Sequence, residues 1–160
     1  MSMSNKIEHL KMIQAIITRM GGNLFILKGW TITLIVGLLT VATKNEEGIY
    51  VLFSFFLIAV FWLLDGFFLS IERCYRDLYN YVRNKKEKDI DFSMDYRKYK
   101  KDKNTWVCSI LSKTLIPFYG SLLVIMLFVT LTLKIKSIKV TLYSYCNEQN
   151  SNEIINLIKE

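Results

Sequence analysis

The stretch from Ile49 to Asn84 constrains the fold of this chain more than any other. An apolar run to Leu64 is followed by Asp65 and a polar continuation, with no proline and a single glycine, Gly66. Because a backbone exposed to lipid must satisfy its own hydrogen bonds, the stretch predicts one long helix. At about 1.5 Å per residue, this helix spans a hydrocarbon core of roughly 30 Å and projects about 20 Å beyond it. It therefore joins a membrane to an aqueous compartment.

Two further apolar runs are as long as transmembrane helices, which need about 20 residues. One covers residues 24–43 and is interrupted only by Lys28, and the other covers residues 114–133 and carries no charge. Together with residues 49–71 they predict an all-α integral membrane protein, a single domain with three transmembrane helices. No soluble segment is large enough for an ordinary active site, so we expect no enzymatic activity. The scattered cysteines and the single histidine predict no metal or cofactor.

The remaining segments are expected to complete this domain. Apolar residues at helical spacing over residues 5–20 predict an amphipathic helix that ends at Gly21 and Gly22 and lies along the inner leaflet or against the projecting part of the second helix. A basic linker follows over residues 85–103. The third helix is expected to begin near Asn104 or Thr105 and to bend at Pro117. We expect a short strand at residues 138–145 of the tail, which covers residues 134–160.

The charges predict an orientation. The chain has 21 Lys and Arg against 14 Asp and Glu. Twelve of the basic residues lie in residues 72–113 and three precede the first span, whereas the turn after that span has one lysine beside Glu46 and Glu47. By the positive-inside rule, we expect the N-terminus and residues 72–113 to be cytoplasmic. Three spans then leave the tail outside, a placement that its three lysines at residues 134–139 disfavour.

Two charged residues lie within the predicted spans. Counted from the turn near Glu46, Lys28 is eighteen residues back and Asp65 is nineteen forward, so an antiparallel hairpin sets them at nearly equal depth. A charge inside a membrane is costly and usually finds a partner. We expect an ion pair, with snorkelling of Lys28 to the headgroups as the alternative.

A stripe of small residues marks a packing face of the first span. Gly29, Thr33, Gly37 and Thr40 recur at spacings of four, four and three. Small residues let helix backbones approach closely, and close packing drives the association of helices in lipid. The stripe is expected to meet either the second span or a neighbouring copy of the chain.

The second helix also carries a polar and aromatic stripe that crosses the predicted membrane boundary. Phe61, Asp65, Phe68 and Glu72 share one face, with Phe67 beside it. Such a stripe is typical of a pore lining in which aromatic rings form a hydrophobic constriction. The alternative is a buried network between subunits with no path for water.

Basic residues with interleaved aromatic residues form a second candidate site. Its members are Arg73, Arg76, Arg83, Lys85, Lys86, Lys98, Lys100, Lys101 and Lys103. Cations that meet phosphates and rings that stack on bases suit single-stranded nucleic acid. The same residues suit anionic lipid headgroups.

A series of residues in the first half of the chain forms a recognisable pattern. It consists of Ile13, Gln14, Ile17, Arg19, Met20, Asn23, Phe25, Lys28, Gly29 and Trp30, followed by Phe61, Trp62, Leu64, Asp65, Gly66, Glu72, Arg73, Arg76, Leu78 and Tyr79. This pattern resembles a group of small bacterial membrane proteins of antiphage defence, in particular the membrane effector of the Hailong system.

The resemblance implies a homo-oligomeric ion channel of the bacterial inner membrane, for which we expect a tetramer, that acts in abortive infection. It implies that single-stranded DNA oligomers made by a partner nucleotidyltransferase hold the channel closed until phage infection removes them. It also implies an aromatic gate, for which Phe61, Phe67 and Phe68 are the candidates. The residues alone leave open a non-conducting anchor or scaffold that recruits a soluble partner through the basic linker. A small transporter subunit is disfavoured by the lack of an inverted repeat.

Overall fold

Long helices make up most of the protein. The structure, a computed structural model, describes residues 3–45 and 48–159. The long helices are α1 (Met3–Asn45), α2 (Gly48–Asn84) and α4 (Leu115–Lys159). Between α2 and α4 lie three short 3-10 helices and a short helix: η1 (Glu87–Asp89), η2 (Arg97–Tyr99), η3 (Asp102–Asn104) and α3 (Trp106–Ile110). No strand occurs within the two described ranges.

Three of the helices are long and apolar enough to cross a membrane. They are Asn5–Thr43, Gly48–Asn84 and Leu115–Tyr145. The expectation of an all-helical integral membrane protein with three spans is confirmed at this level. Glu46 and Glu47 of the predicted turn lie outside the described residues.

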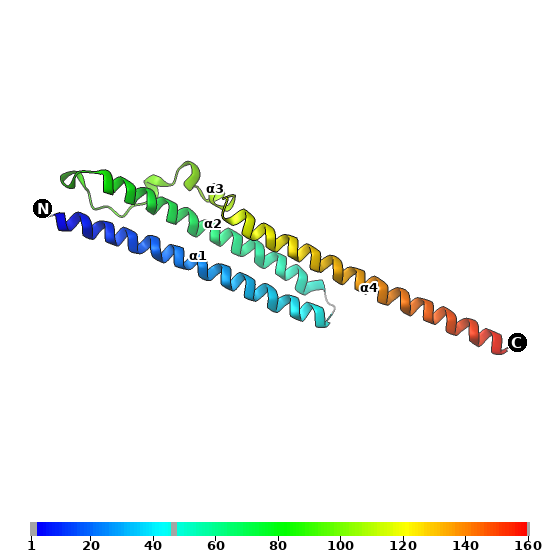
Figure 1. Ribbon diagram of the computed structural model, residues 1–160. Coiled ribbons are helices and arrows are strands. Elements are labelled where there is room, and N and C mark those ends of the chain that lie inside the picture. Colours follow the sequence, from blue (N-terminus) through cyan, green and yellow to red (C-terminus); the bar gives the residue numbers. More distant parts are fainter. Residues whose placement is uncertain (1–2, 46–47, 160) are drawn as a thin grey trace. The chain divides into compact units, whose positions relative to one another are not determined.

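The chain divides into two compact units. The first covers residues 1–122 and contains α1, α2, α3 and the first two turns of α4. The second covers residues 123–160 and is the rest of α4, a single helix. In the first unit α1 and α2 lie side by side and antiparallel, and the segment between η1 and α3 folds back along α2 (Figure 1).

Helix α1 is continuous through Gly21 and Gly22, so the predicted end of an amphipathic helix at these glycines is wrong. Each glycine lowers the stability of a helix by about 1 kcal/mol relative to alanine. Ending the helix at these glycines would cost more, because it would break several backbone hydrogen bonds. Ile13 and Ile17, on the first part of α1, are buried against α2. Residues 5–20 are therefore the first part of one helix that continues into the first span.

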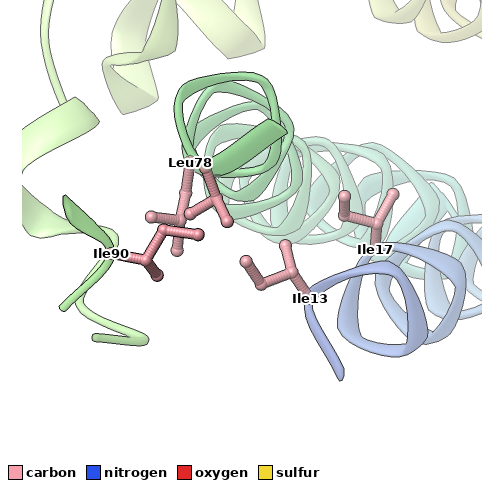
Figure 2. Close-up of a cluster of buried hydrophobic side chains, with 5 residues drawn as sticks. Ile13, Ile17, Leu78 and Ile90 are labelled. Atoms are coloured by element: carbon pink, nitrogen blue, oxygen red, sulfur yellow. The ribbon is translucent and has the colours of Figure 1, made fainter. Parts of the chain in front are cut away.

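The hydrophobic core of the first unit lies at the polar ends of α1 and α2. Ile13 and Ile17 meet Leu78 and Val82 of α2, and Ile90, after η1, closes the cluster (Figure 2). Aromatic side chains of the linker pack around it, among them Phe92 and Tyr99. The basic linker over residues 85–103 is therefore folded onto the helix pair.

The third span begins differently from the prediction. A helix does start at Trp106, after Thr105, but it ends at Ile110, and a new helix begins at Leu115. Pro117 lies in the first turn of α4, where a backbone N–H has no partner within the helix, so the expected bend does not occur there. The Leu115 N–H donates instead to the Ser112 hydroxyl, at 3.2 Å.

The tail is helical as well. Helix α4 continues to Lys159, so the predicted strand at residues 138–145 is wrong. The alternating β-branched and aromatic residues of that stretch favour a strand only where a neighbouring strand can pair with it, and the described residues contain none.

Candidate functional site

An ion pair joins the first two spans. Lys28 Nζ lies 2.7 Å from Asp65 Oδ2, as the hairpin count predicts. Asp65 is completely buried, whereas about a quarter of the Lys28 side chain is exposed. The ammonium group also lies 5.7 Å from the centre of the Phe118 ring, a cation–π contact. Lys28 therefore pairs across the hairpin, and the alternative of snorkelling does not describe its position.

Tyr119 completes this cluster from the third span. Its hydroxyl donates to the same Asp65 oxygen, at 2.9 Å. The ring is fully buried and stacks on Trp62, with the ring centres 5.6 Å apart and the planes inclined by 10°. Asp65 therefore connects α1, α2 and the start of α4, while its Oδ1 is buried without a hydrogen-bond partner among the described residues.

Tyr119 was not predicted to belong to this site. The signal was a phenol in an otherwise apolar run, since a buried tyrosine hydroxyl usually finds a hydrogen-bond partner. An ion pair with a second donor meets the requirement that charges inside a membrane be satisfied. This arrangement holds helices in register, and it offers no nucleophile and no general base that faces an open cavity.

A second set of contacts docks the segment before α4 onto α2. The α2 residues involved recur at helical spacing: Trp62, Gly66, Ser70, Arg73 and Asp77. Gly66 allows the closest approach, because a Cβ atom there would overlap the Ile110 side chain and lie 3.2 Å from the Ile110 Cα. Arg73 Nη1 donates to the Lys103 carbonyl, at 2.9 Å. Arg73, a predicted ligand residue, therefore has a structural contact.

Asn104 holds the linker at the centre of this docking face. Its amide nitrogen donates to Asp77 Oδ2, at 2.6 Å, and to the Tyr99 carbonyl, at 3.0 Å. Its backbone carbonyl accepts a hydrogen bond of 2.6 Å from the Ser70 hydroxyl. Asn104 is thus a buried bridge, and Thr105 occupies the N-cap position of α3.

The five predicted pore residues do not form a continuous exposed face in one chain. Asp65 and Glu72 are buried, and Glu72 pairs with Arg76 of the same helix, at 2.6 Å. Phe61 and Phe68 are partly buried. Only Phe67 is exposed, at 44%.

The predicted ligand residues separate into two groups. Arg73, Arg76 and Lys85 make contacts within the chain, and the Lys85 ammonium lies 4.4 Å from the centre of the Tyr81 ring. The others have exposed side chains: Arg83, Lys86, Lys98, Lys100, Lys101 and Lys103. One small pocket of about 270 Å³ does include a predicted residue; it is lined by Gln14, Ile17, Arg76, Tyr79 and Asn80.

The tyrosines of the linker face inward. The Tyr96 ring lies 5.0 Å from that of Tyr75, and the Tyr99 ring lies 5.9 Å from that of Tyr81. Burial raises the pKa of the Tyr99 hydroxyl, and the neighbouring Tyr81 adds to the shift. Both linker rings are thus used in the fold and are not displayed for stacking on bases.

Two stripes on the spans are exposed within the first unit. Gly29, Thr33, Gly37 and Thr40 are exposed on α1, and no atom lies within 4 Å of a Cβ built on either glycine. Of the two predicted alternatives, packing of this stripe on α2 is therefore not observed. A second stripe on α2 exposes larger side chains: Phe53, Phe56, Leu63 and Phe67.

No group of His, Cys, Asp and Glu within the described residues could hold a metal ion. No protein-family model, curated protein or solved structure matches the chain.

Proposed function

We propose that the protein is a homo-oligomeric ion channel, a tetramer, of the bacterial inner membrane. The observation that carries this proposal is the stripe of Gly29, Thr33, Gly37 and Thr40, which is exposed within the first unit. In lipid such a stripe stabilises a protein only when another helix packs against it. In this proposal that helix belongs to another copy, and conduction takes place between copies, because α1 and α2 pack directly against each other.

The N-terminus and residues 72–113 are cytoplasmic in this proposal. The start of α1 and the basic linker lie at the same end of the α1–α2 hairpin, since Lys6 Nζ donates to the Arg83 and Lys85 carbonyls, at 3.0 and 2.6 Å. In this proposal the fifteen basic residues of these two segments are thus on the same side of the membrane, as the positive-inside rule requires.

Phe67 is the first candidate for the gate. It is exposed and follows Asp65 by two residues, at the inner end of the exposed aromatic stripe on α2. Rings brought together from several copies would form a constriction that closes by excluding water. In this proposal Phe61 and Phe68 flank the Phe67 ring. The cluster around Asp65 fixes the rotation of α2, and this rotation determines where the Phe67 ring lies.

The ligand and the biological role rest on the resemblance described above. In this proposal, single-stranded DNA oligomers from a partner nucleotidyltransferase bind the exposed lysines and keep the channel closed. Their loss during phage infection opens the channel, and the infected cell loses its membrane potential. The DNA must bind the closed state more tightly, by about 1.4 kcal/mol for each tenfold change in population ratio.

The proposal is tested by ion flux into liposomes that contain only the purified protein. We expect flux that Phe67→Ala alters and that Phe25→Ala, an exposed phenylalanine on α1, leaves unchanged. Short single-stranded DNA on the accessible side should suppress the flux. Reversal of four exposed lysines (K98E, K100E, K101E and K103E) should remove that suppression.

A matched pair tests the oligomer. Gly37→Leu should disrupt assembly and abolish flux, whereas Val36→Leu, at the adjacent exposed position, should preserve both. A correctly inserted protein that is monomeric and silent under every condition would exclude the channel. Binding of DNA or of a soluble partner without flux would favour the anchor or scaffold, which the exposed lysines of the linker also support.

A further inference from the structure

Helix α3 lies at the level where α2 changes from apolar to polar. Its first residue, Trp106, donates to the Leu63 carbonyl, and its last, Ile110, accepts from Trp62 and packs on Gly66. Both contacts are next to Asp65, at the end of the apolar run of α2. The predicted second span ends at residue 71, six residues beyond Asp65, so in a bilayer this level lies within about 9 Å of the boundary between acyl chains and headgroups.

Helix α3 and the two residues after it bury polar side chains and expose apolar ones, which is the reverse of an ordinary surface helix. Ser109 and Ser112 are buried, with exposed fractions of 0% and 5%, while Trp106, Val107 and Leu111 are exposed by 43%, 64% and 61%. Exposed apolar side chains beside buried hydroxyls suit contact with lipid. Tryptophan in particular is enriched at the membrane boundary.

The flanks of α3 are strongly basic. Residues 97–113 contain six basic residues and one acidic residue. The basic residues are Arg97, Lys98, Lys100, Lys101, Lys103 and Lys113, and all six are exposed. None of them forms an ion pair with a described carboxylate. A second copy of this face would be repelled by like charges, whereas anionic headgroups would be attracted by about 1 kcal/mol for each basic residue near the surface.

Close to α3 this face fits lipid better than nucleic acid, which in the proposed function binds the exposed basic residues farther from α3, such as Lys98 and Lys100. The Tyr96 and Tyr99 rings are packed against Tyr75 and Tyr81, so the basic stretch does not display them to bases. The aromatic ring that is exposed, Trp106, lies among apolar neighbours at the boundary level.

We propose that residues 97–113 bind the headgroups of anionic phospholipids of the adjacent leaflet. Trp106, Val107 and Leu111 enter the acyl-chain boundary, and the lysines that flank α3, chiefly Lys101, Lys103 and Lys113, contact the lipid phosphates. The site requires only that the chain lies in a bilayer, and it is independent of conduction.

The test compares the full-length protein in nanodiscs that contain phosphatidylcholine and phosphatidylglycerol, with bromine on the acyl chains of one lipid or the other. Bromine quenches tryptophan fluorescence at short range, and subtraction of the Trp106→Phe signal isolates Trp106. Brominated phosphatidylglycerol should quench Trp106 as if the ratio of phosphatidylglycerol to phosphatidylcholine around it were about fivefold above the bulk ratio, as a gain of about 1 kcal/mol implies. K101E/K103E/K113E should abolish the enrichment, and the neutral K101Q/K103Q/K113Q should reduce it.

The matched control is R83E/K86E/K88E, which changes the same number of exposed charges near the far end of α2. Asn84 is eighteen residues beyond Gly66, or about 27 Å along a helix, so the control should keep the enrichment. Equal quenching by the two brominated lipids in the wild type would overturn the proposal. So would a triple reversal that loses binding of single-stranded DNA while the lipid enrichment stays unchanged.

Discussion

Trp62 of α2 and Trp106 of α3 each donate an indole hydrogen bond to a backbone carbonyl of the other's helix. Trp62 Nε1 lies 3.0 Å from the Ile110 oxygen, and Trp106 Nε1 lies 3.0 Å from the Leu63 oxygen. Two bonds donated in opposite directions fix both the position and the rotation of α3 on α2. The pair therefore determines which side of α3 faces outward.

Trp106→Phe should loosen α3 while the fold is kept. Loss of one hydrogen bond costs about 1 kcal/mol, which corresponds to roughly fivefold faster hydrogen–deuterium exchange of the amides of residues 106–112. Trp30→Phe is the control, since Trp30 is exposed on α1 and its indole makes no hydrogen bond to a described residue. Equal exchange in the two variants would show that the indole bond does not hold α3.

Gly66→Ala should separate α3 from α2. The added methyl group would overlap the Ile110 side chain and come within 3.3 Å of the Ile110 backbone nitrogen. Overpacking of this kind costs about 1–3 kcal/mol of unfolding free energy. Gly21→Ala meets no atom within 4 Å and should stabilise α1 by up to about 1 kcal/mol. Reversible unfolding in mixed micelles measures both, and the prediction fails if both variants are stabilised.

The ion pair of Lys28 with Asp65 should show strong coupling. Lys28→Met leaves a fully buried carboxylate with Tyr119 as its only donor, and should cost about 3–5 kcal/mol. The double variant K28M/D65N should recover most of that loss. Lys11→Met, an exposed lysine on the same helix, should change stability by less than about 0.5 kcal/mol. Additive losses in a double-mutant cycle would contradict the prediction.

Asn104→Ala should release the basic linker. It removes the bonds to Asp77 and to the Tyr99 carbonyl and leaves their partly buried oxygens without these donors, at a cost of about 1–3 kcal/mol. Limited trypsin digestion should then cleave at Lys100, Lys101 or Lys103 faster than in the wild type. Asn80→Ala, on an exposed part of α2, should leave the digestion rate unchanged, and identical rates in both variants would rule out the bridging role.

His9→Leu should stabilise the first unit. His9 is 1% exposed, its ring lies 5.4 Å from that of Phe92, and neither ring nitrogen has a hydrogen-bond partner among the described residues. Replacing an unsatisfied polar group by an apolar one should raise the unfolding free energy by about 1 kcal/mol. Thr18→Leu, at an exposed position of α1, provides the comparison. A loss of stability in His9→Leu would show that the imidazole has a polar partner.

The features that depend on spacing along one hairpin were predictable from the sequence. Three apolar runs indicate three spans, and counting from one turn places Lys28 opposite Asp65. Counted from the same turn near Glu46, Arg19 is twenty-seven residues back and Glu72 is twenty-six forward. The count thus predicts a second pair, but Glu72 pairs with Arg76 four residues away. An ion pair within one helix needs no register between helices, and it was therefore available at a lower entropic cost.

The contacts of the third span and the linker were not predictable in the same way. The segment between α2 and α4 has no regular period, so no count relates Tyr119 to Asp65. The acceptors of three of these hydrogen bonds, from Trp62, Trp106 and Arg73, are backbone carbonyls. Since every residue has a backbone carbonyl, the sequence does not show which residue is the acceptor. Gly66 gave a signal, as the one glycine of residues 49–84. Its partner Ile110 could not be chosen from the many apolar residues of the chain.

Neither α1 nor α2 has a break where it leaves its apolar run: α1 passes through Gly21 and Gly22, and α2 continues past Asp65 to Asn84. A helix of 37 residues is a rod about 55 Å long. A helix without a break tilts as one rigid body. A sideways displacement of its aqueous end therefore moves the opposite end, at the far side of the bilayer, in the opposite direction. A change of tilt at the cluster of Leu78 and Ile90 is therefore carried along both helices to the pair of Lys28 and Asp65.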